Sequence, residues 1–240
     1  MEQYIFLTLL TIFAAFIGTI TGFGLSTIMI PAMLLFYPLP LTLLFVGIIH
    51  LFGDVWKIIL FKRGANWKLI LAFGIPGILF SYLGASISLT VSPLLLKRLL
   101  GAFLLMYVVF LLYKTTWKIP ETGRTSILGG SLSGFFAGIF GVGGAIRSAF
   151  LSVYNLPKEV FIFTSGMIAL FIDITRVSKY IMGGLTVPTI MLYFLALLIP
   201  CSLLGAYFSK KILHKIPQNK FRIVIAIMLG IMSLKFIIFP

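Results

Sequence analysis

The chain has 240 residues, of which 60% are apolar and only 10% are charged. A soluble domain of this size cannot remove so much apolar surface from water, whereas a lipid bilayer can, because its interior is itself apolar. The composition therefore excludes a soluble enzyme or binding domain, and it indicates a protein that crosses the membrane many times.

The net charge of +14 comes from 19 basic residues that sit mainly between apolar runs. The cytoplasmic retention of positive charge places basic residues in such connections. No basic stripe alternates with exposed aromatic residues, so nucleic acid is not an expected partner. The single cysteine, Cys201, lies inside an apolar run, and no disulfide framework is expected.

Eight apolar segments follow one another along the chain, and short charged connections separate them. They lie at residues 4–36, 39–61, 67–90, 95–113, 126–155, 159–181, 186–209 and 221–239. The first is well beyond the roughly 20 residues that one crossing needs. This pattern predicts an all-α polytopic membrane protein.

The second half of the chain repeats the first at a shift of 119 residues. The equivalent positions are Gly22-Phe23-Gly24 with Gly141-Val142-Gly143, Asp54 with Asp173, and Lys57 with Arg176. Two of only five acidic residues match in this way, which unrelated apolar sequences would rarely do. The sequence predicts a single membrane domain of two transmembrane repeats, residues 1–119 and 120–240.

The basic residues indicate that these repeats are inverted. If all eight segments cross once, the two sides of the membrane receive 9 and 10 of them, which is no bias. If the first segment of each repeat breaks at its glycines and returns, the sides receive 14 and 5, as the positive-inside rule requires. Each repeat is then a glycine-broken helical hairpin plus three transmembrane helices. Both termini are expected outside a cytoplasmic (inner or plasma) membrane.

The glycine breaks are candidate substrate sites. Glycine weakens a helix, and a helix that restarts after a break points free amides and the positive end of its dipole forwards. Two such breaks would meet near the midplane of a repeat transporter and would face a shared, partly wet space that attracts anions. The candidate substrate-binding residues are Gly22, Phe23, Gly24, Gly141, Val142, Gly143, Gly144 and Arg147.

Two other interpretations of these glycines stay open. The spacing of Gly18 and Gly22, and of Gly134 and Gly138, also suits close helix packing. In addition, Thr21-Gly22-Phe23-Gly24 is similar to a potassium-filter loop, in which carbonyl oxygens coordinate a cation. A channel with re-entrant glycine loops is therefore an alternative function, and a non-catalytic membrane subunit is another.

The segment Gly134-Phe135-Phe136-Ala137-Gly138-Ile139-Phe140-Gly141-Val142-Gly143-Gly144, with the chain length and the two-half layout, resembles the sulfite exporter TauE/SafE family of membrane permeases. The resemblance spans nearly the whole chain. It implies transport of sulfite, organosulfonates or related sulfur anions. Family members commonly carry a proline after each glycine cluster; Pro31 fills this place in the first half, whereas Arg147-Ser148-Ala149-Phe150 contains none.

Ionisable residues inside membrane spans are costly unless they are paired or hydrated, so each is a functional candidate. Arg147 follows the second break, where a guanidinium suits an oxyanion; the alternative is that it snorkels to the interface. The pairs Asp54–Lys57 and Asp173–Arg176 each share one helix face.

In the inverted arrangement these two pairs are expected on opposite sides of the midplane, towards opposite mouths. They are candidate gates or sites of proton coupling, and local charge neutralisation is the structural alternative. His50, one turn before Asp54, is a candidate proton relay or simply a hydrogen-bonded side chain.

His50 and His214 match no nucleophile–base–acid arrangement, and Cys201 has no histidine or cysteine at metal-ligand spacing. The sequence therefore predicts no enzymatic activity, no metal site and no cofactor. The sequence instead predicts a secondary transporter that moves a small anion, sulfite or an organosulfonate, by alternating access. The expected partners are the anion and the lipid bilayer. A proton is the candidate coupling ion, and a homodimer is a candidate assembly.

Overall fold

The protein, seen in a computed structural model, is described over residues 2–62, 64–113, 120–213 and 218–239. Arg63, Lys114, Lys118 and Lys215, which enter the count of basic residues, lie outside these ranges. The described residues form α-helices and one short 3-10 helix. The helices are α1 (Glu2–Thr21), α2 (Ser26–Met33), α3 (Leu39–Leu60), α4 (Trp67–Thr90), α5 (Pro93–Tyr113), α6 (Gly123–Phe140), α7 (Gly144–Leu151), η1 (Ser152–Tyr154), α8 (Lys158–Met182), α9 (Thr189–Ile212) and α10 (Gln218–Ile238).

The predicted all-α membrane class is confirmed. Within the described ranges, α1, α3, α4, α5, α8 and α9 are long and apolar enough to cross a membrane. The ends of α3, α4, α5, α8 and α9 agree with the apolar segments of the sequence to within a few residues, whereas α1 ends at Thr21, inside the predicted segment 4–36. Local signals explain several starts: Pro38 and Pro157 directly precede α3 and α8, where a proline costs no helical hydrogen bond, and the Asn66 side chain caps α4.

Both long glycine-containing segments are broken, as predicted. The first break separates α1 from α2 at residues 22–25, and the second separates α6 from α7 at residues 141–143. Gly22, Gly24 and Gly141 have φ angles of 73°, 78° and 73°, a region that other residues enter only at a cost. The glycines therefore end one helix and allow the next to start in a new direction.

Not every predicted glycine belongs to a break. Gly130, Gly134 and Gly138 form one seam of α6 against α4, where a Cβ on Gly134 would lie 2.2 Å from the carbonyl oxygen of Gly77. A Cβ on Gly138 would lie 2.2 Å from the carbonyl oxygen of Ser81. The packing interpretation therefore holds for these glycines, because only small residues let the two backbones approach so closely.

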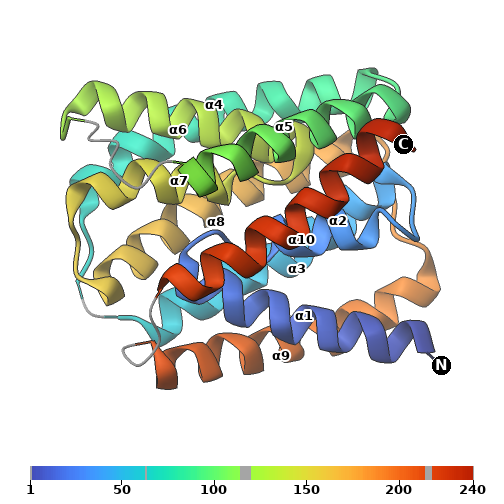
Figure 1. Ribbon diagram of the computed structural model, residues 1–240, viewed down its shortest axis with the longest axis horizontal. Helices are drawn as coiled ribbons and strands as arrows, with labels where there is room; N and C mark the ends of the chain where they lie inside the picture. The colour runs from blue at the N-terminus through green and yellow to red at the C-terminus, as the bar shows by residue number, and fades with distance from the viewer. Residues whose placement is uncertain (1, 63, 114–119, 214–217, 240) are drawn as a thin grey trace.

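The two halves use their helices in the same way. Helix α4 packs along α6, and its equivalent α9 packs along α1, while α3 pairs with α8 and α5 with α10. Figure 1 shows both termini at one end of the molecule, with α1 starting at that end and α6 starting at the opposite end. Opposite directions of equivalent helices are what an inverted repeat requires, and the inverted relation with its membrane sides stays a prediction.

Candidate functional site

Helices α3 and α8 carry the four predicted gate or coupling residues into the protein interior. On α3, Lys57 Nζ donates to Asp54 Oδ1 at 2.8 Å, and on α8, Arg176 Nε donates to Asp173 Oδ1 at 2.7 Å. Each pair is three residues apart on its helix, so both partners face the same way. All four residues are at most 3% exposed. The predicted intrahelical pairs therefore exist and are fully enclosed by protein.

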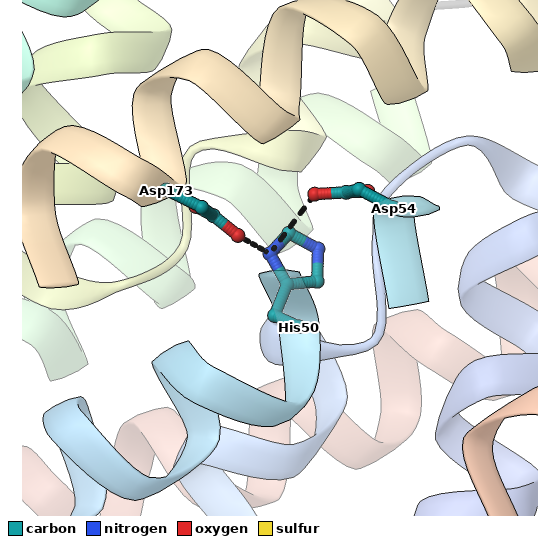
Figure 2. A group of neighbouring side chains, drawn as sticks. All are labelled: His50, Asp54 and Asp173. Atoms are coloured by element: carbon teal, nitrogen blue, oxygen red, sulfur yellow. Dashed lines mark hydrogen bonds and ion pairs between the residues drawn. The ribbon is translucent and has the colours of Figure 1, made fainter. Parts of the chain in front are cut away.

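His50 joins these two pairs (Figure 2). Its Nδ1 hydrogen-bonds Asp173 Oδ2 across the α3–α8 interface, and it lies 3.7 Å from Asp54 Oδ2 one turn along its own helix. The expectation that the pairs lie apart, towards opposite mouths, is therefore wrong. The equivalent helices α3 and α8 pack against each other, and this contact brings the equivalent aspartates to one place.

Arg147 is the fourth residue of α7, and its side chain is only 1% exposed. The snorkelling alternative is thereby excluded. Its Nε donates to Ser165 Oγ on α8 at 2.9 Å, and Ser165 Oγ lies 3.5 Å from the carbonyl oxygen of Gly22 at the first break. Arg147 comes from the second break, so this chain of contacts connects the two breaks. Ser165 has no signal in the sequence that could have identified it.

The Arg176 guanidinium lies beside the second break. A Cβ on Gly141 would be 3.3 Å from Arg176 Nη1, and one on Gly47 of α3 would be 3.2 Å from the same atom. Among the described residues, no group accepts a hydrogen bond of good geometry from either Nη atom of Arg176 or Nη2 of Arg147, although the Tyr180 hydroxyl interacts with the Arg176 side chain. Buried guanidinium donors are rarely left without an acceptor, because desolvation without a hydrogen bond costs free energy.

The buried centre carries excess positive charge. Lys57, Arg147 and Arg176 contribute three cations, and Asp54 and Asp173 contribute two carboxylates. Arg147 interacts electrostatically with both carboxylates and with the other arginine, so these groups form one cluster. A protonated His50 would increase the excess. The arrangement is suited to bind an anion, which would both neutralise the cluster and accept hydrogen bonds from the free guanidinium nitrogens.

The same cluster offers the ligand atoms of a metal site, since His50, Asp54 and Asp173 place one each within 4.8 Å of one another. Both carboxylates already bind a cationic side chain, Lys57 or Arg176. A divalent ion would have to displace these cations or sit beside them. The donor set therefore fits a network of ion pairs better than a metal centre.

The two breaks pack directly on each other. A Cβ on Gly144 would lie 1.7 Å from the carbonyl oxygen of Phe23, and Gly141, Val142, Gly143 and Gly144 are all buried. The amides of Gly22, Phe23, Gly24, Gly141 and Val142 are hydrogen-bonded within their own segments. The prediction of a wet space shared between the breaks, lined by free amides at these positions, is therefore wrong: close backbone packing fills that place.

An open cleft of about 460 Å³ lies to one side of the first break. Thr21 and Phe23 of the break line it together with residues of α5, α7 and α8 and with Leu213 after α9. It lies where α8 begins and α9 ends, at the end of the molecule opposite the termini (Figure 1). The sequence did not identify this cleft, because four separate stretches of the chain form it.

A polytopic helical bundle with discontinuous helices and a buried charged centre defines a membrane transporter. The chain belongs to the sulfite exporter TauE/SafE family, whose model matches residues 7–236. It is also 27% identical over 191 residues to a protein of Methanocaldococcus jannaschii described as a probable membrane transporter protein, an alignment that covers 72% of this chain and 68% of the relative. No solved structure matches the chain.

Proposed function

We propose that the protein is a secondary transporter that moves a small oxyanion, sulfite or an organosulfonate, across the membrane, and that the anion binds at the buried cationic centre. One observation carries the proposal: three guanidinium nitrogens, Arg147 Nη2 and both Nη atoms of Arg176, are buried and make no hydrogen bond of good geometry among the described residues. The family description supports sulfite as the first substrate to test.

The geometry suits an oxyanion for a physical reason. A guanidinium presents paired N–H donors that match the spacing of two oxygens on a sulfite or sulfonate group. The two arginines belong to α7 and α8, and their contacts reach both glycine breaks. Both arginines belong to the second repeat, and an anion held between them would lie where this repeat meets the first break and Gly47 of α3.

Alternating access is supported by the arrangement of the helices. The halves are built alike, their equivalent helices run in opposite directions in Figure 1, and the breaks are in contact. If the two halves exchanged the way in which their helices pack, the buried centre would open first to one side of the membrane and then to the other. The direct contact between the breaks also favours a carrier over a channel with an open path along the glycine loops.

His50 is the candidate route for proton coupling. It hydrogen-bonds Asp173 and lies near Asp54, so a proton on the imidazole would strengthen the α3–α8 contact and add a positive charge beside the anion. Loss of that proton would weaken the α3–α8 contact and remove the positive charge beside the anion. A proton and an anion would then bind together, and a pH gradient would drive the anion across the membrane.

The test is uptake of radiolabelled sulfite into proteoliposomes that contain the purified protein, with and without a pH gradient. Saturable uptake that protein-free liposomes lack, and that the gradient accelerates, is the expected result. Uptake no faster than in protein-free liposomes would contradict the transport proposal. Unitary currents in planar bilayers of the same lipids would instead identify a channel.

A further inference from the structure

The cleft beside the first break is built differently from the buried centre. Aromatic side chains form much of its wall, namely Phe23, Tyr107, Phe110 and Phe161. Polar groups join them from Thr21, Ser148, Asn155 and Lys158. An apolar wall with a few convergent polar groups is the usual composition of a small-molecule site.

The size of the cleft indicates the size of its ligand. Its volume of about 460 Å³ falls in the range of sites that enclose organic molecules, about 300–1,000 Å³. Sulfite has four heavy atoms and would occupy the space of a few water molecules, ~30 Å³ each. A bare inorganic anion would therefore leave most of the aromatic wall in contact with water. An anion that carries an apolar body would cover that wall.

Two polar groups in the cleft are free to bind an anionic head. Ser148 is 4% exposed, and its Oγ has no hydrogen-bond partner among the described residues although it lines the cleft. Lys158 Nζ donates to the carbonyl oxygen of Leu213 at 3.3 Å, which uses one of the three donors of an ammonium group. A buried hydroxyl and a cation at the same cleft favour a negatively charged group there.

The cleft also lies next to the buried centre. Ser148 directly follows Arg147 on α7, and a Cβ on Gly22 would be 2.4 Å from Phe161 and 2.9 Å from Ser148 Oγ. The other side of Gly22 faces Ser165, the partner of Arg147. Gly22 therefore contacts both Phe161 and Ser148, which line the cleft, and Ser165, which binds Arg147.

We propose that this cleft is a vestibule that binds an organic anion with an apolar body, such as an aromatic sulfonate, before its head reaches Arg147. The ammonium of Lys158 and the hydroxyl of Ser148 bind the sulfonate group, and Phe161 packs against the apolar body. The inference rests on the proposed function and deepens it, because it names the part of the substrate that the vestibule recognises.

The experiment compares benzenesulfonate with methanesulfonate, which has the same charged head and lacks the ring. Binding to the detergent-purified protein is measured by isothermal titration, and inhibition of labelled-sulfite uptake is measured in proteoliposomes. Benzenesulfonate is expected to bind about tenfold more tightly or better, the order that burial of a phenyl ring supplies. Equal binding of the two sulfonates would overturn the proposal.

Variants locate the site. Phe161→Ala is expected to reduce the preference for benzenesulfonate, and Lys158→Gln is expected to weaken both sulfonates. Phe208→Ala, at a 51% exposed position on α9 outside the cleft, is the matched control and should change neither. A preference that survives Phe161→Ala would place the ring elsewhere and contradict the proposal.

Neutral benzenesulfonamide separates an anion site from a general apolar groove. Its binding is expected to be much weaker than that of benzenesulfonate, and equal binding would mean that lipid or detergent occupies the groove and would overturn the inference. The two proposals also fail separately. Sulfite uptake without any preference for the ring would leave the transport function standing, whereas ring-selective binding without uptake would leave only the vestibule.

Discussion

The two glycine breaks make the same turn in different surroundings. The first break lies beside the cleft, and Gly22 contacts Phe161 and Ser148 there. The second break is enclosed, and Gly141 contacts Ile30 of α2 and lies close to Arg176 of α8. One break is therefore next to an accessible surface, while the other is part of the buried interior.

The chemistry around the breaks differs more than the backbone does. At the shift of 119 residues, Arg147 is equivalent to Ile28, and His50 is equivalent to Ala169. The paired aspartates and their basic partners, by contrast, occur in both halves. Both repeats therefore keep the helix breaks and the ion pairs. Only the second repeat supplies the extra cation, Arg147, and only the first supplies the histidine, His50.

Loss of Arg147 is expected to have the largest effect on transport. Arg147→Ala should lower the rate of sulfite uptake by about 30-fold or more, because removal of a buried charged partner costs about 2–5 kcal/mol. Arg147→Lys keeps the charge without the paired donors and should recover only part of the rate. Lys211→Ala on the exposed end of α9 is the control. A parental rate in Arg147→Ala would remove its assigned role.

The aspartates give the next largest effect, and the two are not expected to be equal. Asp173→Asn removes the carboxylate that both Arg176 and His50 bind, whereas Asp54→Asn mainly removes the partner of Lys57. Breaking a buried pair costs about 3–5 kcal/mol, so Asp173→Asn should lower the thermal unfolding temperature in detergent more than Asp54→Asn does.

Both aspartate variants should also slow turnover. Normal uptake rates in both would reject a gating or coupling role, even if the stability ranking holds. The double variant Asp173→Asn/Arg176→Gln should be less destabilised than Asp173→Asn alone, because it no longer leaves a guanidinium without its counter-charge. An additive loss in the double variant would show that this ion pair is not what stabilises the centre.

A substitution at the first break has a smaller, mainly structural effect. Gly24→Ala places a Cβ 2.2 Å from His50 Nε2 at a φ of 78°, so it should destabilise the protein by about 1–3 kcal/mol. Gly74→Ala in α4 meets no atom within 4 Å and should be neutral or slightly stabilising. Equal melting temperatures of the two variants would contradict the close approach of the break to His50.

The topology test should leave transport unchanged. Single cysteines at Glu2 and Lys62, introduced in a Cys201→Ser background, should react with a membrane-impermeant maleimide from opposite sides of the vesicle. The inverted arrangement requires this result, since α1 to α3 would otherwise end on the side where the chain begins. Labelling of both positions from one side would overturn the inverted repeat.

The sequence predicted the scaffold because its signals are local. Apolar runs give the spans, and the adjacent glycines at positions 141, 143 and 144 give the second break. Helix α6 is the instructive case: it does not reach the hydropathy of a membrane span in the described chain, although most of it lies in the predicted apolar segment 126–155. The match of Asp54 with Asp173 also indicated that these two distant positions are equivalent in the two repeats.

The geometry of the site could not be predicted from local sequence patterns, because contacts between helices create it. His50 meets Asp173 only because α3 packs on α8, and Ser165 holds Arg147 only because α7 lies against α8. The expected space between the breaks failed for the same reason, since Gly144 lets the backbone at Phe23 fill it. Pairings between helices, and the cleft that four stretches of the chain create, depend on packing that the spacing of residues does not encode.

The most direct test of the central claim is to locate the anion itself. Selenite has the shape and charge of sulfite, and its selenium scatters anomalously, so crystals soaked in selenite would report its position in an anomalous difference map. The anion is predicted to lie within hydrogen-bond distance of the Arg147 and Arg176 guanidinium groups. Selenium peaks confined to surface lysines, with none at these two arginines, would contradict the account.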